Sequence, residues 1–205
     1  MRPRGPVFRS IGKWAAELLL VFLGAYAAFW LSNHQERLEQ AHRRQQILTA
    51  LEEQVTADLE SAREQRAQQA KGLAAFKHAL EAGEMPALTP LSFTSDYSAT
   101  DTATLLQSGG YQLLGVKTLV ALRHLESVLR GGISAIKHAQ DLSDALIVPN
   151  LDQDITFFYD PSTKQLRKRF SRYTNSLESF QAFYNDYIAA LTDLLGQIRA
   201  ERAKQ

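Results

Sequence analysis

A continuous apolar run from Trp14 to Leu31 constrains this 205-residue chain more than any other feature. It reads WAAELLLVFLGAYAAFWL, and Glu17, near its start, is the only charged residue within it. Eighteen helical residues rise about 27 Å, which is close to the hydrocarbon thickness of a bilayer. The rest of the chain holds no comparable run that would bury such a helix. The run therefore predicts a single transmembrane helix over residues 14–32.

The residues around the run predict its orientation in the membrane. The N-terminal flank carries only basic charges, at Arg2, Arg4, Arg9 and Lys13. Basic residues keep their side of a first membrane helix in the cytoplasm. The two tryptophans, Trp14 and Trp30, stand at the ends of the run, where indole rings favour the membrane interface. We therefore expect a cytoplasmic tail over residues 1–13, an anchor in the bacterial inner membrane, and an extracytoplasmic domain over residues 33–205.

Three details of the run bear on its role. Ala25-Tyr26-Ala27 has the form of a signal-peptidase site, so a cleaved signal peptide is the alternative to a permanent anchor. Glu17 lies about one turn inside the expected cytoplasmic boundary, which favours an interfacial carboxylate over a proton relay. Gly24 and Ala28 are small and four residues apart, a spacing that lets two membrane helices approach closely and self-associate.

The sequence after the run predicts an all-α domain. Residues His34–Ala82 contain no proline, are rich in helix-forming residues, and repeat apolar side chains at helical spacing. We expect this amphipathic helix to continue directly from the transmembrane helix, to bend or break near Gly72, and to stop at Gly83. Residues 83–98 contain two prolines and predict a connecting loop.

Two or three further helices are expected to pack with the first as an elongated bundle. In chain order, the sequence predicts a short helical piece at residues 102–107, a turn at Ser108-Gly109-Gly110, a helix over residues 116–129, an interruption at Gly131-Gly132, a continuation over residues 133–146 that stops at Pro149, and an irregular or short-strand segment over residues 147–170.

The last helix has the clearest periodicity. Its apolar residues follow one another at spacings of three and four, the pattern of a coiled-coil seam: Leu177, Phe180, Tyr184, Tyr187, Leu191, Leu194 and Ile198. Asn175 and Glu178 fit a capping box at its start. Such a seam needs an apolar face to meet. We therefore favour a fold in which the long proximal helix is one arm of the bundle over one in which it is only a spacer.

The sequence contains no motif that predicts catalysis or metal binding. Cysteine is absent, and the five histidines show no zinc-ligand spacing. Asn150-x-Asp152-x-Asp154 resembles the start of a calcium loop, but Ile155 and Pro161 stand where that loop requires Gly and Glu. We therefore expect no catalytic residues, no metal and no cofactor.

A basic cluster with two interleaved aromatic residues precedes the last helix. Its members are Lys164, Arg167, Lys168, Arg169, Phe170, Arg172 and Tyr173. Nucleic-acid binding requires such a patch, but the expected location outside the cytoplasm excludes that partner. Lipid headgroups and an acidic protein partner stay open as functional interpretations, beside a simple solvated helix start.

Two stretches of the chain resemble a family of uncharacterised bacterial single-pass membrane proteins. In and after the apolar run the matching residues are Glu17, Gly24, Ala28, Asn33 and Glu36. Residues 105–129, LLQSGGYQLLGVKTLVALRHLESVL, are similar to that family's serine-glycine turn and leucine-rich helix. Ala16 and His34 depart from the glycine and the tryptophan that are common there. The resemblance implies a single-pass topology and a helical outer domain, and it implies no catalytic activity.

Three functional hypotheses follow from these features. The first is a non-enzymatic, membrane-anchored helical module that contacts itself or another envelope protein, through the small-residue face of the span and through Phe180, Tyr184 and Tyr187. The second is an extracytoplasmic ligand-sensing module that signals through a partner protein. The third is an enzyme, and it has the least support because no nucleophile, base and oxyanion site can be assembled from the sequence.

Overall fold

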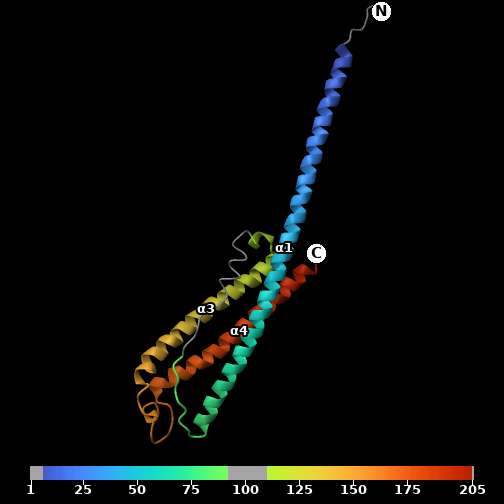
Figure 1. Cartoon of the computed structure of the whole chain (residues 1–205). Helices are drawn as coiled ribbons and strands as arrows, with labels where there is room; N and C mark the ends of the chain where they lie inside the picture. The colour runs from blue at the N-terminus through green and yellow to red at the C-terminus, as the bar shows by residue number, and fades with distance from the viewer. Residues whose placement is uncertain (1–6, 92–109, 205) are drawn as a thin grey trace, which may run out of the picture. The chain divides into compact units, whose positions relative to one another are not determined.

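The computed structural model describes residues 7–91 and 110–204, with side chains described from Leu18 onward. Its long helices are α1 (Val7–Glu81), α3 (Val116–Leu146) and α4 (Ser171–Arg202) (Figure 1). In these described ranges, four short 3-10 helices accompany them: η1 (Gly110–Leu113), η2 (Val148–Asn150), η3 (Ile155–Phe157) and η4 (Lys168–Phe170). Within the described residues, β pairing is limited to one bridge between Tyr159 and Leu166. The expected all-α fold with packed long helices is confirmed.

The chain divides into two compact units, Met1–Gln46 and Ile47–Gln205. In the first unit, every side chain described from Leu18 to Arg43 is exposed. In the second unit, buried side chains begin at Leu48. Over the part of the chain that the structure describes, no helix carries an apolar stretch long enough to cross a membrane.

The second unit is a bundle in which three helical faces share one apolar core. Its main members are Leu48, Leu51, Val55, Leu59 and Ala62 from α1, Ala121, Leu122, Leu125, Leu129 and Ile136 from α3, and Phe180, Tyr184, Tyr187, Leu191, Leu194 and Ile198 from α4. On each helix these residues recur at spacings close to the helical repeat, so they form one stripe. From Leu48 onward, the long proximal helix is therefore an arm of the bundle.

Polar contacts at the edge of the core show that α1 and α4 run antiparallel. Near the start of the α1 arm, Arg199 Nε donates to Glu52 Oε1 over 2.8 Å. Near its end, Lys77 Nζ lies 2.6 Å from Glu178 Oε1. Arg202 also donates to Glu52, and the two guanidinium groups hold the pKa of that carboxyl below its usual value. Residue numbers therefore rise along α1 as they fall along α4.

The same argument makes α3 antiparallel to α4. Thr118, in the first turn of α3, donates its hydroxyl to the buried Glu201 carboxylate near the end of α4. Further along α3, Gly132 lies against the ring of Phe183. Since both α1 and α3 oppose α4, they are parallel to each other. The connection between them consequently starts at one end of the bundle and finishes at the other.

The carboxylate of Glu201 also satisfies the start of α3. The N-cap residue Gly115 has no side chain to accept a hydrogen bond, and its backbone N–H donates to Glu201 Oε1 over 2.8 Å. A Cβ at Gly115 would lie only 2.8 Å from Glu201 Oε2, so the glycine leaves room for the carboxylate. A negative charge at this position also complements the helix dipole of α3. One residue of α4 thereby performs the capping that the local sequence of α3 lacks.

The C-terminal end of α1 agrees with the expected stop but not with the expected break. Gly83 has a φ of +72°, and the N–H groups of Gly83 and Glu84 donate to the carbonyls of Leu80 and Ala79 over 3.0 and 2.9 Å. This is the Schellman arrangement that ends many helices. Of the bend or break expected near Gly72, the break is wrong, because α1 is continuous through this residue. A helical glycine costs only about 1 kcal/mol, which packing of the adjacent turns offsets.

Two expectations about the later helices are also wrong. α3 is continuous across Gly131-Gly132, where an interruption was expected. The expected capping box at Asn175 and Glu178 lies inside α4, which begins at Ser171 directly after η4. The buried ring of Phe170 fixes this earlier start, and it is only 1% exposed.

Residues 147–170 are irregular, as expected, and they surround a second apolar cluster. Its buried members are Leu88, Ile147, Phe158, Tyr159, Phe170 and Tyr173. The exposed Asp160 organises the turn that follows Tyr159. Its carboxylate accepts hydrogen bonds from the Ser162 hydroxyl and from the N–H groups of Thr163 and Ser162, and these donors lower the pKa of Asp160 to about 2.

The glycine pair in α3 yields a matched test of the packing. A Cβ at Gly132 would overlap the Phe183 ring, whereas a Cβ at Gly131 would meet nothing within 4 Å. The ring has little room to move because it stacks on Tyr187 and packs against Tyr184. We expect Gly132→Ala to lower the free energy of unfolding by about 1–3 kcal/mol through overpacking. Gly131→Ala is expected to raise it by about 0.5–1 kcal/mol through helix propensity.

Denaturant unfolding of the full chain measures both values. Equal effects of the two substitutions would contradict the close approach of α3 and α4 at Gly132.

Candidate functional site: an exposed apolar run and a cavity in the bundle

The described part of the apolar run is exposed on every side of its helix. From Leu18 to Leu31 its large side chains are between 53% and 74% exposed: Leu18, Leu19, Leu20, Val21, Phe22, Leu23, Tyr26, Phe29, Trp30 and Leu31. A surface helix of a globular protein normally pairs one apolar stripe with a polar face. A contiguous apolar surface of this extent marks an interaction site.

The small residues expected to mediate packing lie on this exposed surface. Gly24 and Ala28 are both exposed, and a Cβ at Gly24 would meet nothing within 4 Å. At the end of the run, the rings of Trp30 and His34 stack with centroids 5.6 Å apart. The other expected anchoring residues, Arg2, Arg4, Arg9, Lys13 and Trp14, and the carboxylate Glu17, have side chains outside the described residues.

The seam of α4 is buried inside the bundle. Phe180, Tyr184 and Tyr187 are 3%, 4% and 8% exposed, and they pack against α1 and α3. Leu191, Leu194 and Ile198 are also buried in this core, while Leu177 is partly buried at the second cluster. The hypothesis that Phe180, Tyr184 and Tyr187 contact a separate protein is therefore wrong. Their periodic stripe is already used to hold the bundle together.

The basic cluster before α4 is partly engaged within the chain. The Arg169 guanidinium lies over the rings of Phe157 and Phe170, 4.3 and 4.5 Å from their centroids. Arg167 Nε donates to the backbone carbonyl of Tyr159 over 2.9 Å. The interleaved aromatic residue Tyr173 is buried, as is Phe170. Neither ring is thus available for stacking on a ligand, and at least these two cations stabilise the loop.

A short segment after α1, which we call the strap (residues 84–91), is held onto the bundle by side chains from three other elements. The Tyr159 hydroxyl donates to the Pro86 carbonyl, and the Tyr173 hydroxyl donates to the Thr89 carbonyl over 2.9 Å. The strap's last N–H, from Leu91, donates to Oγ of the buried Ser143 in α3 over 2.9 Å. These hydrogen bonds satisfy backbone groups that a non-helical segment would otherwise leave unpaired.

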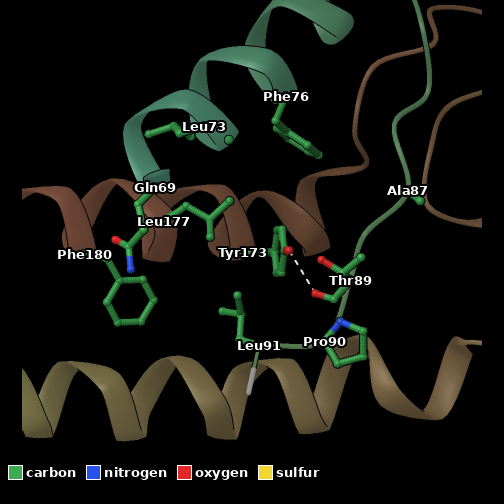
Figure 2. Close-up of a pocket in the computed structure, with 11 residues that line it drawn as sticks. Gln69, Leu73, Phe76, Ala87, Thr89, Pro90, Leu91, Tyr173, Leu177 and Phe180 are labelled. Carbon is green, nitrogen blue, oxygen red and sulfur yellow. Dashed lines mark hydrogen bonds between the residues drawn. The ribbon is translucent and has the colours of Figure 1, made fainter. Parts of the chain in front are cut away.

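A cavity of about 390 Å³ lies between the strap, the C-terminal part of α1 and the N-terminal part of α4 (Figure 2). Most of its lining is apolar, and the larger side chains are Leu73, Phe76, Leu91, Tyr173, Leu177 and Phe180. Its volume lies at the small end of the range for ligand pockets, which is about 300–1,000 Å³. The cavity therefore has the size and the lining of a site for a small molecule.

The polar groups of the cavity are few and uncharged. None of the described residues that line it carries a formal charge. The Tyr173 hydroxyl, shown in Figure 2, donates a hydrogen bond to the Thr89 carbonyl. Its oxygen still has lone pairs that can accept a hydrogen bond. Gln69 Oε1 is buried and receives no hydrogen bond from any described residue. Among the buried side-chain oxygen and nitrogen atoms of the described residues, Gln69 Oε1 is the one without a hydrogen-bond partner.

No group of three or more His, Asp or Glu side chains that could hold a metal ion occurs in the described ranges 18–91 and 110–204.

No family model, no curated protein and no solved structure matches the chain. The resemblance to bacterial single-pass proteins through Gly24, Ala28 and Asn33 stays a prediction.

Sequence reasoning missed the cavity and the strap. Pro86 and Pro90 indicated a loop there, but no spacing signal connects this loop with Tyr159, Tyr173 or Ser143. The cavity walls come from three segments that are far apart in the chain, so no single window of sequence contains their pattern.

The strap's first hydrogen bond gives a pH-dependent prediction. Burial, and to a smaller extent the proximity of Tyr173, raises the pKa of Tyr159 from 10.0 to about 12. The folded chain thus holds this phenol proton more tightly than the unfolded chain does. Its contribution to stability is complete below pH 10 and is lost as the pH rises from about 10 to about 12.

We expect Tyr159→Phe to lower the free energy of unfolding at pH 7 by about 1 kcal/mol, because the Pro86 carbonyl loses its donor. The variant should also lose less stability than the parent chain when the pH is raised above 10. Urea unfolding at a series of pH values measures both effects. Equal stability at pH 7 with parallel curves at alkaline pH would show that this hydrogen bond does not hold the strap.

Proposed function

We propose that this chain is a non-enzymatic, membrane-anchored helical module of the bacterial envelope that acts through contacts with itself or with another envelope protein. The observation that carries the proposal is the apolar run of α1, whose described side chains from Leu18 to Leu31 are exposed on every side. A helix that is apolar all round is stable only when it is surrounded by protein or by lipid. No described side chain of the chain covers it, and a bilayer is the partner whose chemistry fits it.

An energetic estimate supports membrane insertion of the run. Between Leu18 and Leu31 the sequence has eight Leu, Val and Phe residues. Each favours the centre of a membrane helix by about 0.3–0.6 kcal/mol, which gives a total of about 2–5 kcal/mol. Glu17 and the expected basic flank lie at the boundary, where charged groups reach water or headgroups. The N-terminal positive charges favour a cytoplasmic N-terminus and an extracytoplasmic bundle.

A function through contacts with other proteins or with lipid is supported by the surfaces that are not buried in the bundle core. The aromatic seam of α4 is buried in the core of the bundle. The self-association surface that we propose is therefore the small-residue face of the run, at Gly24 and Ala28. Close approach of two helices at such a face gains packing contacts in lipid, where apolar burial alone gives little. The basic residues before α4 are a second surface, which suits lipid headgroups or an acidic partner.

The second candidate function is a ligand-sensing module that signals through a partner. The observation that favours it is the cavity beside the strap, because a pure scaffold does not require a pocket of this volume.

Charged substitutions in the run test the anchor directly. One Arg at the centre of a membrane helix costs about 2.5–3.5 kcal/mol. The cost of the two arginines in the double variant Leu20→Arg/Leu23→Arg therefore exceeds the favourable insertion free energy of the whole run. We expect the parent chain to stay in the membrane pellet after alkaline carbonate extraction and the double variant to be released. The matched control is Leu38→Arg/Ala41→Arg, which places two arginines at the same spacing on an exposed part of α1 beyond the run.

The control should stay in the pellet. Release of the parent chain by carbonate, or retention of the Leu20→Arg/Leu23→Arg variant, would contradict the anchor.

A further inference from the structure

We infer that the cavity between α1, the strap and α4 is a binding site for a small, neutral, largely apolar molecule with a single hydroxyl-type group, which the Gln69 amide binds. This site is a property of the bundle and does not depend on the membrane anchor or on its partner.

The apolar character of the ligand follows from the walls. α1 contributes Leu73 and Phe76, α4 contributes Leu177 and Phe180, and the strap contributes Leu91. The rings of Phe76 and Tyr173, which both line the cavity, lie next to each other with centroids 6.4 Å apart. A ligand with an aromatic or branched apolar body would bury its surface against these groups, and each methylene-sized group buried contributes about 0.8 kcal/mol.

The neutrality of the ligand follows from the lack of charge in the lining. Lys77 and Glu178, which follow the lining residues Phe76 and Leu177 in the sequence, form an exposed ion pair that is not part of the lining. A charged ligand would lose its hydration without meeting an opposite charge, which costs far more than the apolar contacts return. Anionic and cationic ligands are therefore disfavoured.

The hydroxyl-type group follows from the state of the Gln69 amide. Its Oε1 is buried without a donor among the described residues, so the present amide orientation contains an unsatisfied acceptor. An unmade hydrogen bond of this kind costs about 1–3 kcal/mol. Oε1 in its present position is closed to solvent, so a ligand meets the other terminal position of the amide. Rotation about the terminal torsion exchanges Oε1 and Nε2 with little change in shape, so that position can hold either an acceptor or a donor. A hydroxyl group can serve as partner in both cases, and the Tyr173 oxygen is a further acceptor.

The probes for the test are p-cresol and p-xylene, which are neutral and nearly the same in shape, and in which a hydroxyl of p-cresol takes the place of one methyl of p-xylene. We would titrate each into the full-length chain in detergent and follow leucine methyl groups by ¹³C NMR. Saturable shifts are expected at Leu73, Leu91 and Leu177. Leu122 and Leu195, which lie in the main core and outside the cavity lining, are the internal controls.

Two variants with a matched control assign the site. Gly72 and Gly131 are both exposed helical glycines at which a Cβ meets nothing within 4 Å, but only Gly72 lines the cavity. Gly72→Leu is expected to abolish the saturable shifts by filling the space, and Gly131→Leu is expected to leave them unchanged. In Gln69→Leu, the affinity of p-cresol relative to p-xylene should fall by roughly three- to tenfold, because only p-cresol loses a hydrogen bond.

The inference is overturned if neither probe gives saturable shifts, if the core leucines shift equally, or if Gly72→Leu binds as the parent chain does. An unchanged affinity ratio in Gln69→Leu would overturn the assignment of the polar contact. Carbonate extraction is independent of all these readouts, so failure of the ligand site and failure of the anchor can be told apart.

Discussion

The interlocking of α4 with both α1 and α3 is the interaction on which the rest of this structure depends. Leu191, Leu194 and Ile198 are at most 1% exposed, and they meet the stripes of the other two helices in one core. Complete burial of each such side chain contributes about 1.5–3 kcal/mol. Since α4 opposes both partners, its position determines that α1 and α3 are parallel.

Parallel α1 and α3 create the conditions for the strap and the cavity. Two parallel helices that follow each other in the chain need a connection that covers the length of the bundle. The strap is the described first part of this connection, and a proline-containing segment cannot satisfy its own backbone by helical hydrogen bonds. Tyr173 and Ser143 supply two of the missing partners. An irregular segment packed on helices fills space less completely than a helix does, and the cavity lies along it.

Sequence periodicity predicted the parts of the fold that depend on local pattern. The stripe on α4 and the stop of α1 at Gly83 could be read because helical spacing and the left-handed conformation of glycine are encoded locally. The expected breaks at Gly72 and at Gly131-Gly132 were wrong because the cost of a glycine is small compared with tertiary packing. At Gly132 the absence of a side chain leaves room for the Phe183 ring. The residues next to Gly132 in the sequence do not reveal this contact.

The start of α4 and the candidate ligand site depended on contacts distant in sequence. Phe170 fixes the helix start through burial in the second cluster, which overrides the capping pattern at Asn175. Likewise, the start of α3 is capped by Glu201, which lies near the C-terminal end of α4. Gln69 appears in the sequence as one of many glutamines on a polar helix, and only the fold places it at a cavity.

The measurement that tests the central claim most directly is mild chemical cross-linking in native membranes, followed by affinity purification and mass spectrometry of the full chain. A module that acts through contacts should be recovered with one stoichiometric envelope protein or as a defined oligomer of itself, and substitution of Gly24 and Ala28 by leucine should reduce a self-contact. Recovery of the parent chain only as an isolated monomer, under conditions that preserve other membrane complexes, would contradict the account.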